Sequence, residues 1–177
     1  MEFYREQRLL KDGFASFSPS EKDEYLKALD QQISCLSQFQ NQKLALEIDT
    51  IIDDLHSKDP RYSWTGIYRL AGNELRLVCF RGPYSPHSVI PLEGGICGAA
   101  IREAKTLNIP DVKADPRYLS CDFRTKSEIV VPIFDETGKA IAEIDIDSHL
   151  ANAFNRNDET SLERLARKLA PSLLRLH

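Results

Sequence analysis

Three acidic residues at alternate positions are the part of this sequence best suited to chemistry. They are Glu143, Asp145 and Asp147, and they alternate with isoleucines in the segment 140–148. An extended strand points alternate side chains to the same side, so the three carboxylates would share one face. Because like charges repel each other at that spacing, the row indicates a site for a cation. A solvent-facing acidic stripe is the alternative that the pattern leaves open.

The cation could be an organic ammonium group or a metal ion. Glu128 begins another β-rich segment, and it would lie near Asp145 and Asp147 if the two segments pair through the turn at 135–138. Ser148 and His149 follow the row, but strand geometry points His149 away from the loop residues that would complete a metal shell. The sequence therefore favours an ammonium group, and we expect no metal.

Two of the four cysteines are candidate nucleophiles. Cys121 lies in a polar loop near Arg124 and Lys126, whose charges would lower the pKa of the thiol and raise its reactivity. Cys97 lies at the start of a predicted short helix, where the helix dipole would also favour the thiolate. Cys97 could equally be a small residue in a tight glycine turn. The absence of any C-x-x-C pair argues against a zinc ribbon or a disulfide framework, so all four should be free thiols.

Short β-rich segments separated by turns must position these residues. Apolar alternation and turn sequences predict an antiparallel meander from residue 63 onward. Strands are expected at 64–70, 75–80, 106–109, 128–134 and 140–148. Helices are expected at 94–102 and from about 157 to 169 or beyond. The fold class is therefore α+β, with the last helix and part of the N-terminal segment on the sheet face opposite the acids.

Residues 1–58 are expected to form a helical arm, and residues 59–177 are expected to form the sheet domain. Ser18, Pro19 and Glu21 have the order of a capping box, which predicts that a helix begins near residue 19. Apolar residues then recur at helical spacing up to Leu55, in two helices or one interrupted helix. These apolar stripes would either cover a sheet face or meet a second copy of the chain. We favour a homodimer.

Length and charge exclude several classes of protein. The chain of 177 residues suits one domain with an arm. Its net charge of -4, with 23 basic and 27 acidic residues spread along the chain, offers no dense positive field for nucleic acid. No apolar run approaches the roughly 20 residues of a membrane span, and the first residues do not resemble a signal peptide. We expect a cytoplasmic protein with neither nucleic acid nor membrane as partner.

Four segments, in this order and at roughly these spacings, resemble the free methionine-(R)-sulfoxide reductases, which have the GAF fold. They are WTGIY, GGICGAAI, CD followed by SEIVVPI, and EIDIDS, and the resemblance covers about residues 63–169. It implies a GAF-type α+β fold, with a central antiparallel sheet, helices packed on one side and a ligand pocket on the other. Residue by residue, the family's essential cysteine falls on Cys121, a second cysteine on Cys97, the acids that hold an amino-acid ligand on Glu128, Asp145 and Asp147, and the aromatic wall on Trp64 and Tyr68.

The resemblance implies a thiol mechanism for reducing free methionine-(R)-sulfoxide. The Cys121 thiolate would attack the sulfoxide sulfur while a protonated carboxylic acid supplies a proton to the departing oxygen. A second thiol would convert the resulting sulfenic acid into a disulfide, and an external thiol reductant such as thioredoxin would reopen it. No other cofactor is implied.

The sequence departs from the family at several positions. The family's further cysteine is missing from the loop before Ile90, where His87 or Ser88 stands instead. Glu143 also precedes the D-I-D segment at a position where an apolar residue is commoner. A second interpretation therefore stays open: a non-catalytic GAF binding or sensor domain whose acid-lined pocket takes an amino-acid-like ligand.

Overall fold

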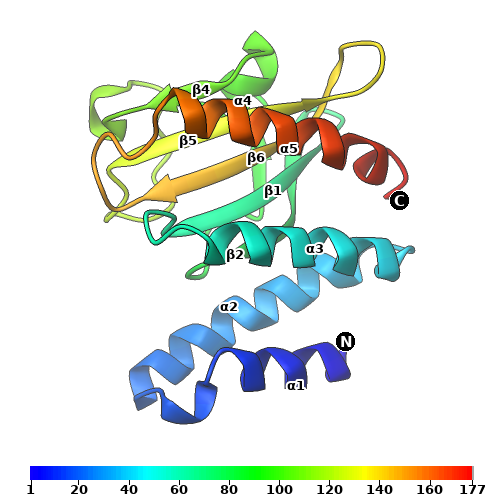
Figure 1. Ribbon diagram of the computed structural model, residues 1–177, viewed down its shortest axis with the longest axis vertical. Helices are drawn as coiled ribbons and strands as arrows, with labels where there is room; N and C mark the ends of the chain where they lie inside the picture. The colour runs from blue at the N-terminus through cyan, green and yellow to red at the C-terminus, as the bar shows by residue number, and fades with distance from the viewer. Residues whose placement is uncertain (177) are drawn as a thin grey trace.

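A six-stranded antiparallel sheet forms the centre of the structure, a computed structural model that describes residues 1–176 (Figure 1). The strands are β1 (Trp64–Ala71), β2 (Glu74–Arg81), β3 (Val89–Pro91), β4 (Leu107–Ile109), β5 (Ser127–Phe134) and β6 (Ala140–Ser148), in the spatial order β3-β2-β1-β6-β5-β4. The α+β class and the five predicted strands are confirmed. The short β3 was not predicted, and it pairs with β2 at the edge of the sheet.

Five α-helices accompany the sheet within the described residues. They are α1 (Glu2–Lys11), α2 (Pro19–Ser37), α3 (Gln42–Ser57), α4 (Gly95–Glu103) and α5 (Arg156–Leu174), with 3₁₀ turns at Phe14–Ser16 and Val112–Ala114. The predicted start of α2 is confirmed, because the Ser18 side chain accepts a hydrogen bond from the Glu21 backbone and Glu21 reaches back to the Ser18 backbone. Helix α5 continues through Pro171 to Leu174. No helix in this part of the chain is long and apolar enough to cross a membrane.

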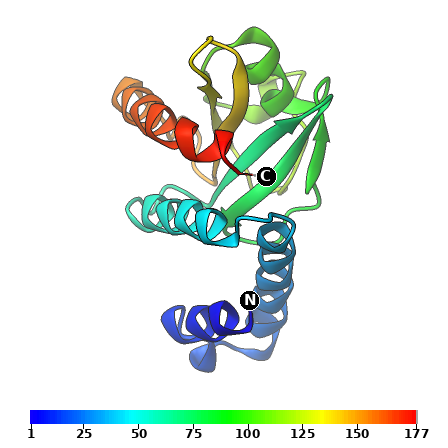
Figure 2. The same cartoon turned by 90° about the vertical axis from the view of Figure 1, so that its right-hand side faces the viewer.

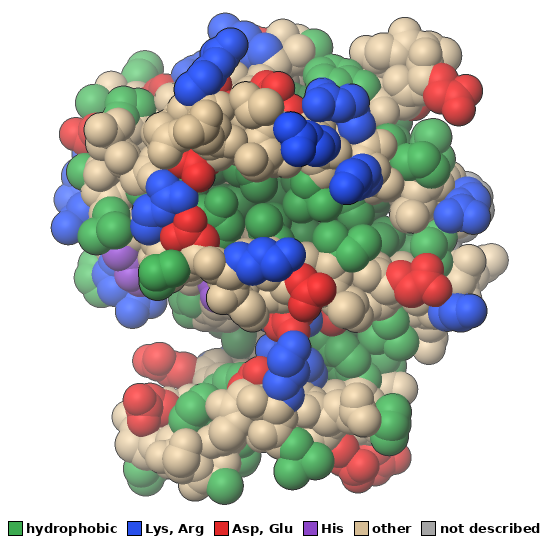
Figure 3. Space-filling view, in the orientation of Figure 1, with side chains coloured by type: hydrophobic (Ala, Val, Ile, Leu, Met, Phe, Trp, Pro, Cys, Tyr) green, Lys and Arg blue, Asp and Glu red, His purple; other side chains and the backbone are tan. Residues whose placement is uncertain are grey.

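One face of the sheet is covered by α3 and α5, which lie side by side in Figure 2. Ile144 and Ile146 of β6 pack there with Ile48 of α3 and Leu162 of α5, and all four are almost completely buried. Each such side chain contributes roughly 1.5–3 kcal/mol when it leaves water. Figure 3 shows apolar side chains in the hollow between these two helices, bordered by basic residues. The predicted position of the last helix and of α3 is confirmed.

The opposite face, which carries the acids, also has a helix packed on it. Helix α4 lies over this face, where Ile96 and Ala100 pack with Phe80 of β2 and Val130 of β5. Part of α2 contributes to the same core through Ala28. The reason is that α4 is apolar on most of its circumference, because every residue from Ile96 to Ile101 is buried.

The apolar stripes of α2 and α3 are buried within the chain itself. Leu36, Ile48 and Ile52 are fully buried, although Ile51, which the helical pattern included, is exposed. A second copy of the chain is therefore not needed to cover these stripes. The homodimer stays a prediction.

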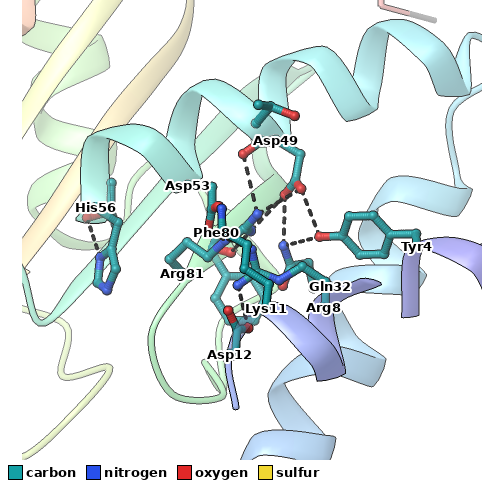
Figure 4. Close-up of polar contacts among 12 residues, drawn as sticks. Tyr4, Arg8, Lys11, Asp12, Gln32, Asp49, Asp53, His56, Phe80 and Arg81 are labelled. Carbon is teal, nitrogen blue, oxygen red and sulfur yellow. Dashed lines mark hydrogen bonds and ion pairs between the residues drawn. The ribbon is translucent and has the colours of Figure 1, made fainter. Parts of the chain in front are cut away.

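Helix α1 has no buried residue and is held by polar contacts (Figure 4). At their centre is Arg81, at the end of β2, which pairs with Asp49 at 2.8 Å and with Asp53 at 2.5 Å. Arg8 of α1 joins Asp53 at 2.6 Å, and the Tyr4 hydroxyl donates to Asp49 at 2.8 Å. Burial alone would raise the pKa of Asp53, but the cations around it lower that pKa far below its usual range. These five residues are called the arginine network below.

Candidate active site

The acidic row of β6 faces the inside of the protein. Glu143 is 0% exposed, Asp145 3% and Asp147 5%, and all three lie on the face covered by α4. Glu128 is directly opposite Asp147 on the paired strand β5. The predicted alternation and pairing are therefore confirmed, and the interpretation as a solvent-facing stripe is wrong. These four residues are called the acid cluster below.

Aromatic side chains of β1 stand on the same face as the acid cluster. The strand register sets Trp64 opposite Asp147 and Tyr68 opposite Glu143. The Trp64 ring stacks on Phe80 with 5.6 Å between ring centroids. Gly66 makes this arrangement possible, because a Cβ atom there would come within 2.2 Å of the Trp64 ring. The structure thus brings the predicted aromatic residues beside the predicted acids.

Cys97 reaches the acid cluster from α4. Its Sγ lies 3.5 Å from Asp145 Oδ2 and 4.0 Å from Glu128 Oε1. Burial, and then the charge of Asp145, raise the pKa of this thiol well above its usual value. The expectation that the helix start would favour a Cys97 thiolate is therefore wrong, because desolvation and three nearby acids outweigh the dipole.

Cys121 approaches the cluster from the loop between β4 and β5. It lines a small cavity together with Trp64 and Asp147. Burial is the main cause that raises the pKa of the Cys121 thiol, and Asp145 and Asp147 raise it further. The expected low pKa is thus wrong for this conformation.

The two cationic residues near Cys121 in the sequence do not lower the pKa of its thiol. Arg124 forms an ion pair with Asp122 at 2.7 Å, and Lys126 is exposed to solvent. The Arg124 charge is therefore paired with a carboxylate and the Lys126 charge is solvated, although both residues are close to Cys121 in the sequence. In this structure neither cation offsets the effect of burial on the pKa of the Cys121 thiol.

Burial favours the protonated form of each acid in the cluster. It raises the pKa of Asp145 and of Glu143 to about 8, with the Glu143 charge adding to the rise at Asp145. The pKa values of Glu128 and Asp147 are raised well above normal for the same reason. Both carboxyl oxygens of Glu143 and Oδ1 of Asp145 are buried without a hydrogen-bond partner. Such groups can donate a proton or accept a cation.

The site is closed over in this conformation. The cavity beside Cys121 has a volume of about 10 Å³, roughly that needed for one water molecule. Its roof is formed by two loops, through Tyr84 and Ser85 in one and Asp122 and Thr125 in the other. A ligand the size of an amino acid can occupy the site only after these loops move.

Sequence reasoning missed the loop residues that close the site. Tyr84 and Ser85 lie 36 or more positions from Cys121 in the sequence, and neither belongs to a periodic pattern. The Tyr68 hydroxyl donates to the His87 carbonyl at 2.7 Å and ties this loop to β1. His149 lies outside the cluster, 3.6 Å from Asp122. The single available signal was the richness of residues 82–88 in Gly, Pro and Ser, which indicates a loop and not its position.

The sequence matches a known domain family and several proteins in it. Residues 48–173 match the family model of the GAF domain. GAF domain-containing protein A of Dictyostelium discoideum is 37% identical over 109 residues, which are 61% of this chain and 68% of that protein. The free methionine-R-sulfoxide reductase of Saccharomyces cerevisiae is 35% identical over 113 residues, 62% of each chain.

Solved structures give the same result. The type II free methionine-R-sulfoxide reductase of Thermoplasma acidophilum superposes with a TM-score of 0.73 at 37% identity, over 75% of this chain and 93% of that one. The free methionine-R-sulfoxide reductase of Neisseria meningitidis, solved in complex with its substrate, has a TM-score of 0.70 at 29% identity, over 83% and 86%.

Proposed function

The chain belongs to the GAF domain family, and from this premise we propose that it reduces free methionine-(R)-sulfoxide with Cys121 as the attacking thiol. One observation carries the proposal: two thiols and four buried acids meet on one face of the sheet, beside an aromatic wall. The relatives named as free methionine-R-sulfoxide reductases support the same activity.

Binding of the amino acid would ionise carboxyl groups whose protonated form burial favours in the closed site. The ammonium group would lie against Asp145 and Asp147, because a neighbouring cation lowers the pKa of a carboxyl and favours its ionised form. Trp64 would contact the apolar part of the side chain. The acids that do not meet the ammonium group would stay protonated and donate to the sulfoxide oxygen.

The chemical step transfers one oxygen atom to Cys121. The bond between the methionine sulfur and its oxygen breaks, a bond between that oxygen and Cys121 Sγ forms, and the thiol proton ends on the oxygen. Methionine sulfur is reduced by two electrons and Cys121 is oxidised by two, to a sulfenic acid. A hydrogen bond from a protonated acid polarises the oxygen in the transition state.

Cys97 is proposed as the second thiol. Cys97 Sγ lies 3.5 Å from Asp145, and Cys121 lines the cavity beside Asp147, so both thiols reach the same acid cluster. Condensation of the Cys97 thiol with the sulfenic acid would give a disulfide and one water molecule. An external dithiol such as thioredoxin would then restore both thiols. This route does not need the cysteine that the family carries in the loop near His87.

The proposal is tested in a single turnover without external reductant. Reduced wild-type protein should release about one methionine per chain from the (R)-sulfoxide and none from the (S)-sulfoxide. Cys121→Ser should abolish release. Cys97→Ser should release methionine once but fail to recycle with thioredoxin, while dithiothreitol still reduces the sulfenic acid.

Cys35→Ser is the matched control, because this buried thiol of α2 lies outside the acid cluster and should leave turnover unchanged. A wild-type protein that binds the sulfoxide but releases no methionine, with Cys121 shown to be reduced, would mean that the chain is a binding domain and not a reductase.

A further inference from the structure

One thiol and two carboxyl groups from three separate elements converge within the acid cluster. Cys97 Sγ of α4, one oxygen of Glu128 of β5 and one oxygen of Asp145 of β6 all lie within 4.8 Å of one another. All three residues are buried. Substrate binding to the acids does not by itself require a thiol at this distance from them.

The spacing of these atoms fits a tetrahedral metal ion. With Zn–S of about 2.3 Å and Zn–O of about 2.0 Å, tetrahedral geometry separates a sulfur and an oxygen ligand by about 3.5 Å. Cys97 Sγ lies 3.5 Å from Asp145 Oδ2 and 4.0 Å from Glu128 Oε1. Small rotations of the side chains would bring the second distance to the same value.

Buried carboxyl oxygens without a hydrogen-bond partner are a second indication of a ligand, separate from the distances between the three ligand atoms. Oδ1 of Asp145 and both carboxyl oxygens of Glu143 are buried and make no hydrogen bond. Glu143 is 0% exposed and shares its strand face with Asp145. Leaving such groups unpaired costs free energy, and a dication bound beside Asp145 would offset part of that cost.

We propose that Cys97, Glu128 and Asp145 form a binding site for a divalent cation of the zinc type. A thiolate with two carboxylates suits zinc or cobalt, whereas magnesium and calcium prefer six or more oxygen ligands. Three protein ligands leave the fourth tetrahedral position to water. The thiol and carboxyl protons are released to solvent when the metal binds.

The sequence does not indicate this metal site, because the histidine near the acids in the sequence is His149. In the structure His149 lies by Asp122, and the thiol comes instead from α4. Sequence separation concealed this, since Cys97 lies 31 residues from Glu128 and 48 from Asp145.

The site would make the reductase sensitive to zinc, a consequence that rests on the proposed function. The metal would occupy the acids that bind the ammonium group and would hold the second thiol away from the Cys121 sulfenic acid. Zinc should therefore raise the apparent KM for methionine sulfoxide and slow recycling by thioredoxin.

Cobalt titration of the reduced full chain tests the site without substrate. One equivalent of Co²⁺ should produce a thiolate-to-cobalt charge-transfer band in the near ultraviolet, and Zn²⁺ should remove it. Cys97→Ser should abolish the band, and Asp145→Asn should weaken binding by at least about tenfold. Cys121→Ser and the exposed Glu136→Gln should keep the band, and circular dichroism should show that each variant is folded.

Absence of the band in the folded wild-type protein, or its persistence in Cys97→Ser, would overturn the proposal. Because no substrate is present, a protein that binds cobalt through Cys97 but never reduces the sulfoxide would refute the proposed reaction and leave the metal site standing. A protein that reduces the sulfoxide, is unaffected by zinc and lacks the band would refute the metal site and leave the proposed reaction standing.

Discussion

Burial of Asp145 links its protonation to the stability of the fold. The pKa of this carboxyl is raised to about 8, whereas an unfolded Asp has a pKa of about 3.9. Between these values the unfolded state is ionised and the folded state holds its proton. The free energy of unfolding must therefore decrease as pH rises from about 4 to about 8, and the contribution is fully lost above the folded pKa.

Asp145→Asn should flatten this dependence. The amide cannot ionise, so the variant should gain stability relative to wild type as pH rises, by at least about 1 kcal/mol between about pH 5 and pH 8. Urea unfolding at both pH values measures the difference. Glu136→Gln, at an exposed turn position, should follow wild type at both. A variant equally destabilised at both pH values would show that the carboxyl has a structural role instead.

Cys121 illustrates which residue properties the sequence could not reveal. Its place in the site is consistent with the resemblance, but the expected low pKa depended on Arg124 and Lys126 facing the sulfur. The short turn instead lets Asp122 accept from Arg124, in a contact between residues two positions apart. The sequence shows which charged residues are near a thiol along the chain. Whether their side chains face the sulfur depends on the local turn.

At the scale of elements, β2 carries two arginines in opposite environments. Arg81 lies in the arginine network with 6% of its side chain exposed, while Arg76 pairs with Glu74 at the surface with 52% exposed. A buried ion pair that loses one partner leaves an uncompensated charge, whereas an exposed pair contributes little because water and salt screen it.

Arg81→Met should therefore destabilise the protein by about 3–5 kcal/mol, because Asp49 and Asp53 lose their shared cation. Arg76→Met on the same strand should cost less than about 1 kcal/mol. Thermal unfolding of the two variants compares them directly. Similar losses for both would contradict the assignment of Arg81 as the centre of the network.

Helices and strands could be predicted where residues close together in the sequence determine them. Alternation and turn residues gave β1, β2, β5 and β6, and the capping serine gave the start of α2. Helix α1 gave no comparable signal, because its contacts with α3 are polar and join residues far apart, such as Tyr4 and Asp49. The position of α4 over the acids was also hidden, since a short apolar helix can pack on either sheet face.

At the scale of the whole molecule, the closed site implies movement during each catalytic cycle. A cavity of about 10 Å³ cannot hold methionine sulfoxide, so the loops 82–88 and 118–126 must open and close again. Amide hydrogen exchange with and without saturating methionine sulfoxide should show protection in these loops on binding, with α5 unchanged. Bound ligand with no change in either loop would place the ligand elsewhere.

The protonated acid cluster also alters the charge that the folded protein presents to its surroundings. The formal net charge of -4 at pH 7 counts all 27 acidic residues as ionised against 23 basic ones. Burial raises the pKa of all four acids of the cluster, so the native molecule carries less negative charge at neutral pH than this count gives. We therefore expect its isoelectric point to lie above the 5.6 given by composition. Mutual electrostatic repulsion between native molecules should then be weakest, and colloidal solubility lowest, at a pH above 5.6.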